Sequence, residues 1–441
     1  MSKGQIKISS NIAGIGGKAF LHDIYGNSYR VSELPTILEQ GSLQVIGFDQ
    51  ETWQSKIVRV QSCVETKPSK LVRIQSCSSF LELQRDSMVY VNENGELNKA
   101  SAGELVSGDL LLMPKSLSFR ENNFQIEKVF PKKRKGSLIK QRAGGKLHEA
   151  DASMSITFLM GLAFVAGLID CKGTYNLETG DILFATNSKI VNNIFAHLIS
   201  SNFLVEPEIN GDHVRVQNKV VVTLIDSFLK EVASQNEEII ANYLAGYFHA
   251  SNAFGFIDKA KLKPCISLHR GGEASSDRLC KCLLTIGVVP FMSNSSYIII
   301  DSGHIETFFS SIPYLIKSLV MKVDDYMTDL TSRPIPAIDL LGYKFGKSFS
   351  NIKEDVGMAA EKYEKLALFE QDNVVMNHDM AADLNKYIKK KSKRSSLSKL
   401  VESSVVGIKV CNTESTPVEK TFTITCDDSC GIFLNNILCT C

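Results

Sequence analysis

The stretch "FVAGLIDCKGTY" (Phe164–Tyr175) places an Ala-Gly pair inside an apolar run with helical spacing and ends it in a partly charged turn. A second stretch, "YLAGYFHASNAF" (Tyr243–Phe254), repeats this pattern further along the chain. Glycine inside a helix costs about 1 kcal/mol relative to alanine, so its recurrence needs a reason. Small residues let two helix backbones approach closely, and the pattern therefore predicts a helix–helix interface. Its predicted residues are Ala166, Gly167, Ala245 and Gly246.

The segments around these stretches also repeat, which is typical of a duplicated unit. In the first copy we expect helices at Phe158–Asp170, Ser188–Ser201 and Val220–Ala233, and strands at Thr174–Glu178, Asp181–Thr186, Val205–Ile209 and His213–Gln217. In the second copy we expect helices at Glu237–Ala250, Ser275–Gly287 and His304–Lys317, and strands at Ala253–Asp258, Lys263–Leu268, Phe291–Ser293 and Tyr297–Asp301. Both copies have the order αββαββα. The sequence thus predicts a pseudo-symmetric tandem unit over residues 151–320 of a monomer.

The two ends of the chain have a different character. Residues 14–116 and 404–441 contain alternating or continuous apolar runs such as "LQVIGFD" and "KTFTITC", which favour strands. Residues 117–150 are polar and basic, as expected of a linker, and residues 321–403 are predicted to form a charged helical segment. The fold class predicted is α+β, with a split β domain that receives a large insertion.

Composition narrows the range of functions. A net charge of +1 over 441 residues means that any nucleic-acid surface must be a local patch. No apolar run has transmembrane length and no signal peptide is visible, so we expect an intracellular protein without a membrane partner. The eleven cysteines contain no Cys-x-x-Cys spacing, so no metal site is predicted. Basic runs at 132–135 and 389–394 favour the nucleus.

The segments "VAGLIDCKG" (Val165–Gly173) and "LAGYFHASN" (Leu244–Asn252) resemble the two LAGLIDADG motifs of homing endonucleases. The resemblance implies two αββαββα units whose sheets straddle DNA, with the last acid of each motif binding a divalent cation. Here that acid corresponds to Lys172 and Ser251.

An ammonium group repels Mg²⁺, the cation that the family uses, and a neutral hydroxyl is a poor substitute for a carboxylate. We therefore predict no cofactor and no DNA cleavage. An atypical metal site that uses Asp170 or another acid is the alternative.

The flanking segments, among them "AFLHDIYGNSYRVSEL" (Ala19–Leu34) and "FTITCDDSCGIFLNNILCTC" (Phe422–Cys441), resemble the Hint domain of inteins and hedgehog proteins. In large inteins this domain is interrupted by an endonuclease. Splicing in that family needs a Cys or Ser nucleophile, a polarising His and a terminal Asn. The corresponding positions hold Gly14, Gln84, Ser87, Cys430 and Cys441. We therefore expect a splicing-dead, free-standing descendant of an intein.

DNA binding does not need the lost acids, because Lys and Arg contacts to phosphates supply most nonspecific affinity. Double-stranded DNA is thus a candidate partner. The candidate contacts are Lys172, His213, Arg215, Lys219, Lys259, Lys261, Lys263, His269 and Arg270. Three hypotheses remain: an intein-derived, splicing-dead and cleavage-dead protein that retains DNA binding, an active site-specific endonuclease with an atypical metal site, and a protein-interaction module without a DNA role.

Overall fold

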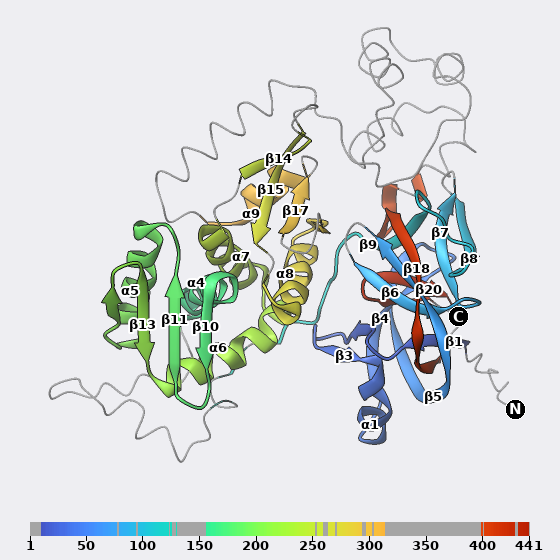
Figure 1. The fold of residues 1–441 in the computed structure, drawn as a ribbon, viewed down its shortest axis with the longest axis horizontal. Helices are drawn as coiled ribbons and strands as arrows, with labels where there is room; N and C mark the ends of the chain where they lie inside the picture. The colour runs from blue at the N-terminus through green and yellow to red at the C-terminus, as the bar shows by residue number, and fades with distance from the viewer. Residues whose placement is uncertain are drawn as a thin grey trace, which may run out of the picture.

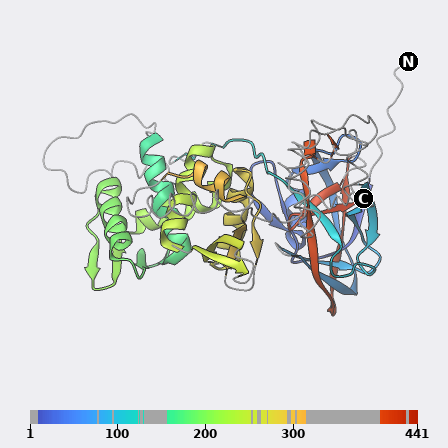
Figure 2. The same cartoon turned by 90° about the horizontal axis from the view of Figure 1, so that it is seen from above.

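The computed structural model describes residues 10–125 and 156–313 with short gaps, together with most of 398–440. Helices and strands are mixed, in agreement with the α+β prediction. Figures 1 and 2 show a β-rich part, coloured blue and red, beside a part that combines helices and small sheets, coloured green to yellow. Among the helices of the described residues, none is long and apolar enough to cross a membrane. The predicted linker 117–150 and charged segment 321–403 lie mostly outside the described residues.

The β-rich part is built on a ten-stranded sheet that contains both ends of the chain. Its strands are β1 (Ser10–Gly16), β4 (Leu43–Asp49), β5 (Gln54–Ser76), β6 (Phe80–Gln84), β7 (Met88–Glu93), β8 (Glu96–Ser101), β9 (Leu110–Pro114), β18 (Val405–Cys426), β19 (Gly431–Leu434) and β20 (Ile437–Thr440). The order is β20-β19-β4-β5-β6-β1-β18-β9-β7-β8, and further pairings of β20 with β7 and of β5 with β18 fold the sheet back on itself. C-terminal strands therefore complete a sheet that N-terminal strands begin.

Strand periodicity explains how this sheet forms its core. In β5, Val58 and Val60 are buried while Arg59 and Gln61 are exposed, because successive side chains of a strand point to opposite faces. A small hairpin of β2 (Phe20–His22) and β3 (Ser28–Arg30), followed by a short 3-10 turn and helix α1 (Leu34–Glu39), lies at one side of the sheet.

The middle of the chain forms two copies of one arrangement. The first contains α4 (Ile156–Lys172), β10 (Gly173–Asn176), β11 (Asp181–Ala185), α5 (Lys189–Phe203), β12 (Glu208–Asn210), β13 (His213–Gln217) and α6 (Lys219–Glu231). The second contains α7 (Glu237–Ser251), β14 (Phe254–Asp258), β15 (Lys263–His269), α8 (Glu273–Thr285), β16 (Phe291–Met292), β17 (Tyr297–Asp301) and α9 (Ile305–Ser311). We call β10–β13 the first small sheet and β14–β17 the second small sheet. Their strand orders, β10-β11-β13-β12 and β14-β15-β17-β16, are equivalent.

The first helices of the two copies, α4 and α7, pack against each other through their glycines. A Cβ atom added to Gly167 would overlap the carbonyl oxygen of Tyr243, and one added to Gly246 would overlap that of Phe164. The two contacts are reciprocal, since each glycine meets the residue three positions before its counterpart. Helix α4 is buried without interruption from Leu162 to Ile169, as expected of a helix that is apolar on all sides.

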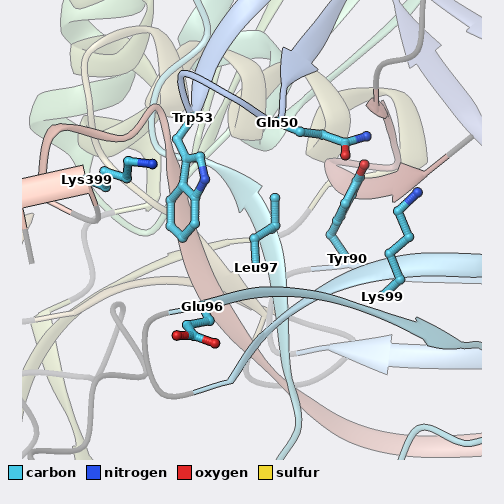
Figure 3. A pocket seen from close by; sticks show the side chains of 7 residues that line it. All are labelled: Gln50, Trp53, Tyr90, Glu96, Leu97, Lys99 and Lys399. Carbon is cyan, nitrogen blue, oxygen red and sulfur yellow. The ribbon is translucent and has the colours of Figure 1, made fainter. Parts of the chain in front are cut away.

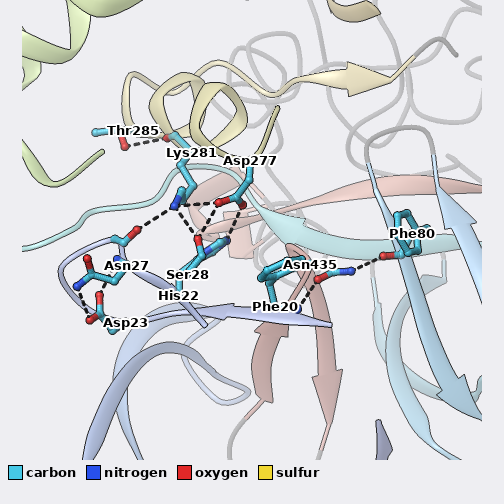
Figure 4. A network of polar contacts seen from close by, with 11 residues as sticks. Phe20, His22, Asp23, Asn27, Ser28, Phe80, Asp277, Lys281, Thr285 and Asn435 are labelled. Carbon is cyan, nitrogen blue, oxygen red and sulfur yellow. Dashed lines mark hydrogen bonds and ion pairs between the residues drawn. The ribbon is translucent and has the colours of Figure 1, made fainter. Parts of the chain in front are cut away.

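Helix α8 joins the second copy to the β2–β3 hairpin through buried polar groups (Figure 4). The Lys281 ammonium, which is 4% exposed, donates to the Gly26 carbonyl at 2.9 Å and to Ser28 Oγ at 2.7 Å, and lies 3.0 Å from Asp277 Oδ2. Ser28 Oγ donates to Asp277 Oδ2 at 2.7 Å. Burial alone would raise the pKa of Asp277, but the charge of Lys281 and the hydrogen bonds from Ser28 and Lys281 together outweigh burial and lower that pKa to about 2. The joint is therefore a hydrogen-bonded ion pair.

The glycine contact generates a stability prediction. Gly246→Ala should destabilise the protein by about 2 kcal/mol, because the added methyl group separates α4 from α7 and outweighs the better helix propensity of alanine. Gly41→Ala is the control, since a Cβ there meets no atom within 4 Å. Thermal unfolding midpoints measure both. A Gly246→Ala midpoint at or above the wild-type value would contradict the close helix contact.

The joint also contains His22, whose Nδ1 lies 3.1 Å from Ser28 Oγ, and this residue generates a pH prediction. Burial lowers the pKa of His22 from 6.5 to about 4, so the folded chain keeps this ring neutral. As the pH falls below 6.5 the unfolded chain binds the proton first, and stability is lost until about pH 4. From pH 7 to pH 5 this single group should cost about 2 kcal/mol. His22→Gln should show a smaller loss of unfolding midpoint over the same interval; an equal loss would refute the assignment.

Candidate nucleic-acid interface

The predicted catalytic positions of the endonuclease-like unit lie at the C-terminal ends of the paired helices. The sequence predicted that the helices end at Asp170 and Ala250, but α4 continues to Lys172 and α7 to Ser251. Lys172 and Ser251 are therefore the last residues of their helices. Helix α4 passes directly into β10, and the Ser251 hydroxyl is hydrogen-bonded to β15.

The Ser251 hydroxyl is engaged with the backbone of the second small sheet. It accepts a hydrogen bond from the His269 amide at 2.7 Å and donates to the Ser267 carbonyl at 3.3 Å. A hydroxyl has one proton to donate, so this proton is already used. The Ser251 side chain therefore links α7 to β15 through hydrogen bonds and carries no negative charge.

Lys172 brings a cation to the same region. Burial lowers the pKa of His269 below its usual value, and the charge of Lys172 lowers it further. Lys172 is half-buried and His269 projects from β15 of the other copy. Helix ends that carry an ammonium group and a hydroxyl do not fit a divalent cation, which needs carboxylate oxygens.

Asp170, the acid that offered an alternative metal ligand, is fully committed to protein contacts. Its Oδ1 accepts from Arg278 Nη2 at 2.6 Å, and its Oδ2 accepts from Arg278 Nε at 3.0 Å and from the Tyr243 hydroxyl at 2.6 Å. The Asp170 carboxylate is 5% exposed. Asp170 therefore forms a buried ion pair between the two copies, and the alternative of a metal site at this acid stays a prediction.

The position equivalent to Asp170 in the second copy is His249, which packs in the core. Its Nδ1 lies 2.6 Å from the Ala245 carbonyl, and its ring meets Phe164 edge-to-face at 5.2 Å. Burial lowers the pKa of His249, so it is neutral. Within the described residues, no cluster of three or more His, Cys, Asp or Glu side chains is arranged to hold a metal ion.

Three of the predicted splicing positions lie together at the start of the large sheet. Gly14 has a φ of +74°, and a Cβ added to it would lie 2.6 Å from Gln84 Oε1 and from Ser87 Oγ. Ser87 Oγ donates to the Ala13 carbonyl at 2.7 Å. The peptide bond before Gly14 thus retains one hydrogen-bond donor, but the nucleophile position has no room for a side chain. Cys430 and Cys441 lie outside the described residues.

Asn435 and Asn436 have a structural role that the sequence did not reveal. They form the turn between β19 and β20 with φ values of +48° and +61°, as two-residue hairpin turns require. The Asn435 amide accepts from the Phe20 backbone at 2.6 Å and donates to the Phe80 carbonyl at 2.6 Å. The Asn435 side chain thus links the β19–β20 turn to β2 and β6.

The predicted DNA contacts of the first copy lie on the open face of the first small sheet. His213 and Arg215 are exposed on β13, whereas Val214 and Val216 are buried beneath them. Arg215, however, is paired with Asp181 at 2.8 Å.

Other residues beside Arg215 also determine the net charge of this face. Glu208 lies directly opposite Arg215 in the neighbouring strand, and Leu183 is 45% exposed on the other side of Arg215. Arg215 therefore faces two carboxylates, Asp181 and Glu208, and the charged residues of this face give it no excess of positive charge.

The other predicted contacts are only partly described. Lys219 is exposed at the first residue of α6, and Lys263 is the first residue of β15. Lys259, Lys261 and Arg270 lie outside the described residues. The structure thus places Lys172 at the end of α4, His269 at the end of β15, and His213 and Arg215 on the first small sheet.

Comparison with known proteins shows distant similarity to two classes. No protein-family model and no curated protein matches the chain. The structure of I-DmoI in complex with DNA and Ca is 14% identical, over 37% of this chain and 98% of that one, with a TM-score of 0.29. A mesophilic variant of the homing endonuclease I-DmoI is 16% identical, over 35% and 96%, with a TM-score of 0.28. The TvoVMA intein is 15% identical, over 23% and 71%, with a TM-score of 0.21. Such weak similarities do not by themselves assign an activity to this chain.

The Asp170 contacts generate a prediction. Asp170→Asn should destabilise the protein by about 3–5 kcal/mol, because Arg278 would keep a largely buried charge without its partner. Asp181→Asn, which breaks the exposed pair with Arg215, should leave the unfolding midpoint nearly unchanged. Urea unfolding of the two variants makes the comparison. Equal midpoints for Asp170→Asn and wild type would show that the pair does not join the copies.

Proposed function

We propose that the chain is an intein-derived, homing-endonuclease-like protein that neither splices nor cleaves DNA but binds double-stranded DNA. In this proposal residues 14–116 and 404–441 form the Hint-like domain and residues 151–320 form a tandem endonuclease-like unit, acting as a monomer with internal two-fold symmetry. The observation that carries the loss of cleavage is the state of the helix ends, where Lys172 and Ser251 replace acids and Asp170 is bound by Arg278 and Tyr243.

The loss of splicing is supported by the crowded position at Gly14. A nucleophilic side chain there would collide with Gln84 and Ser87. Covalent catalysis cannot begin without that nucleophile. The proposal therefore treats the Hint-like sheet as a scaffold.

DNA binding is supported by the position of the small sheets on either side of the paired helices (Figure 1). Both helices end where a small sheet begins, so the helix ends and the open sheet faces form one continuous surface in this proposal. Lys172 stands at its centre, where its ammonium group would contact a phosphate. The charge balance of the first small sheet indicates that few phosphates are neutralised, and the salt dependence should be moderate.

The DNA-binding proposal is tested by mobility shift with random duplex DNA over a salt series. Wild type should bind with an affinity that falls as salt rises, and Lys172→Gln should reduce the log–log salt slope by about 1. Lys230→Gln is the matched control. Lys230 lies on α6, which packs against the buried face of the first small sheet, so Lys230 is not on the proposed DNA surface. Its ammonium group is paired with Asp226. The control should bind like wild type.

Two outcomes would contradict the proposal. Magnesium- or manganese-dependent nicking of plasmid DNA that Lys172→Gln does not alter would indicate an active endonuclease with another site. Failure to bind duplex DNA at low salt would instead favour the protein-interaction hypothesis, for which the exposed Leu183 on the balanced sheet face is the supporting observation. Nuclear location stays a prediction, since the basic runs lie outside the described residues.

A further inference from the structure

The large sheet carries a pocket whose lining belongs to neither degenerate site (Figure 3). Its volume is about 360 Å³, within the range of small-molecule sites. The lining residues are Gln50, Trp53, Tyr90, Glu96, Leu97, Lys99 and Lys399. They come from the β4–β5 turn, from β7 and β8, and from the short helical turn before β18.

Trp53, the single tryptophan of the chain, is held in this wall in a strained conformation. Its φ is +59°, a region that bulky side chains rarely adopt. The backbone fixes it from both sides, because Trp53 N–H donates to the Asp49 carbonyl at 2.9 Å and Ser404 N–H donates to the Trp53 carbonyl at 3.0 Å. Strain that the surrounding structure maintains is characteristic of ligand sites. The conformation directs the indole into the pocket.

The pocket also has an excess of positive charge. Lys99 and Lys399 are both exposed and reach it from different elements, whereas Glu96 is its one acidic lining residue. The Lys99 ammonium lies 5.5 Å from the centroid of the Tyr90 ring, so the cation is positioned above the aromatic wall. A ligand that is anionic at one end and planar at the other would complement both features.

We propose that this pocket binds a nucleoside 5′-monophosphate. The base would lie against Trp53 and Leu97, at the end of the pocket opposite Lys99 (Figure 3). Lys99 would bind the phosphate, and the amide of Gln50, which lies beside Tyr90, can donate to and accept from the ribose between the two ends. An acidic peptide would satisfy Lys99 alone, whereas a nucleotide also uses the aromatic wall.

The sole tryptophan provides a direct readout. Titration of the full chain with AMP should change Trp53 fluorescence in a saturable manner, and calorimetry should give the same Kd. Adenosine and inorganic phosphate are the two partial probes, and each should bind at least about tenfold more weakly, because each lacks one half of the recognised chemistry.

Variants locate the site. Lys99→Gln should raise the Kd for AMP about tenfold, the effect of losing one charged hydrogen bond. Lys420→Gln, at an exposed pair with Glu65, should bind AMP like wild type. Circular dichroism and the unfolding midpoint show that Lys99→Gln is folded.

The proposal is overturned by an absence of saturable change with millimolar AMP, or by phosphate or adenosine binding as tightly as AMP. It is also overturned if a folded Lys99→Gln variant keeps the wild-type Kd, or if duplex DNA displaces AMP, which would make the pocket part of the DNA surface. The result does not depend on whether the small sheets bind DNA.

Discussion

The structure of the middle of the chain depends on the contact between α4 and α7. Gly167 meets Tyr243 and Gly246 meets Phe164, so each backbone approaches the other at a distance that excludes even a methyl group. That contact sets the separation of the helix ends, and with it the separation of the small sheets, since β10 and β14 follow those ends closely. Two helices that are buried along most of their lengths can approach this closely only if small residues lie where they cross. The packing gained by this close approach outweighs the helix propensity that each glycine loses relative to alanine.

The polar residues near the helix ends serve the fold instead of a metal ion. Asp170 joins α4 to Tyr243 and Arg278 of the other copy, and Ser251 joins α7 to β15. The buried Asp170 carboxylate already has its charge compensated by Arg278 and accepts three hydrogen bonds, and an ammonium group at Lys172 would repel Mg²⁺. The contacts that maintain this part of the fold therefore need no metal ion.

Periodicity and the internal repeat predicted nearly every helix and strand of the middle region, most of them to within two or three residues at each end. The strong alternation of His213–Gln217 and the N-capping positions Ser188 and Asn218 are local signals of this kind. Local patterns could not predict contacts between distant residues. Nothing in the sequence pairs Asp170 with Arg278, 108 positions away, or Arg215 with Asp181, and so the charge of the first small sheet was overestimated. Trp53 likewise carries no sequence signal, because its role depends on a backbone conformation and on neighbours from three other segments.

The joint at α8 connects the second copy of the middle region to the large-sheet part of the structure. Lys281 and Asp277 lie one helical turn apart and present an ion pair to the β2–β3 hairpin, whose Gly26 carbonyl and Ser28 hydroxyl complete the hydrogen bonds. Leu284, Val289 and Phe291 of the second copy belong to the same apolar cluster as the strands of the large sheet. A buried ion pair contributes little net stability compared with apolar packing, but it fails when either partner is displaced, and so it specifies one orientation among the many that an apolar contact would tolerate. The middle unit is consequently held against the large sheet in one orientation by both polar and apolar contacts.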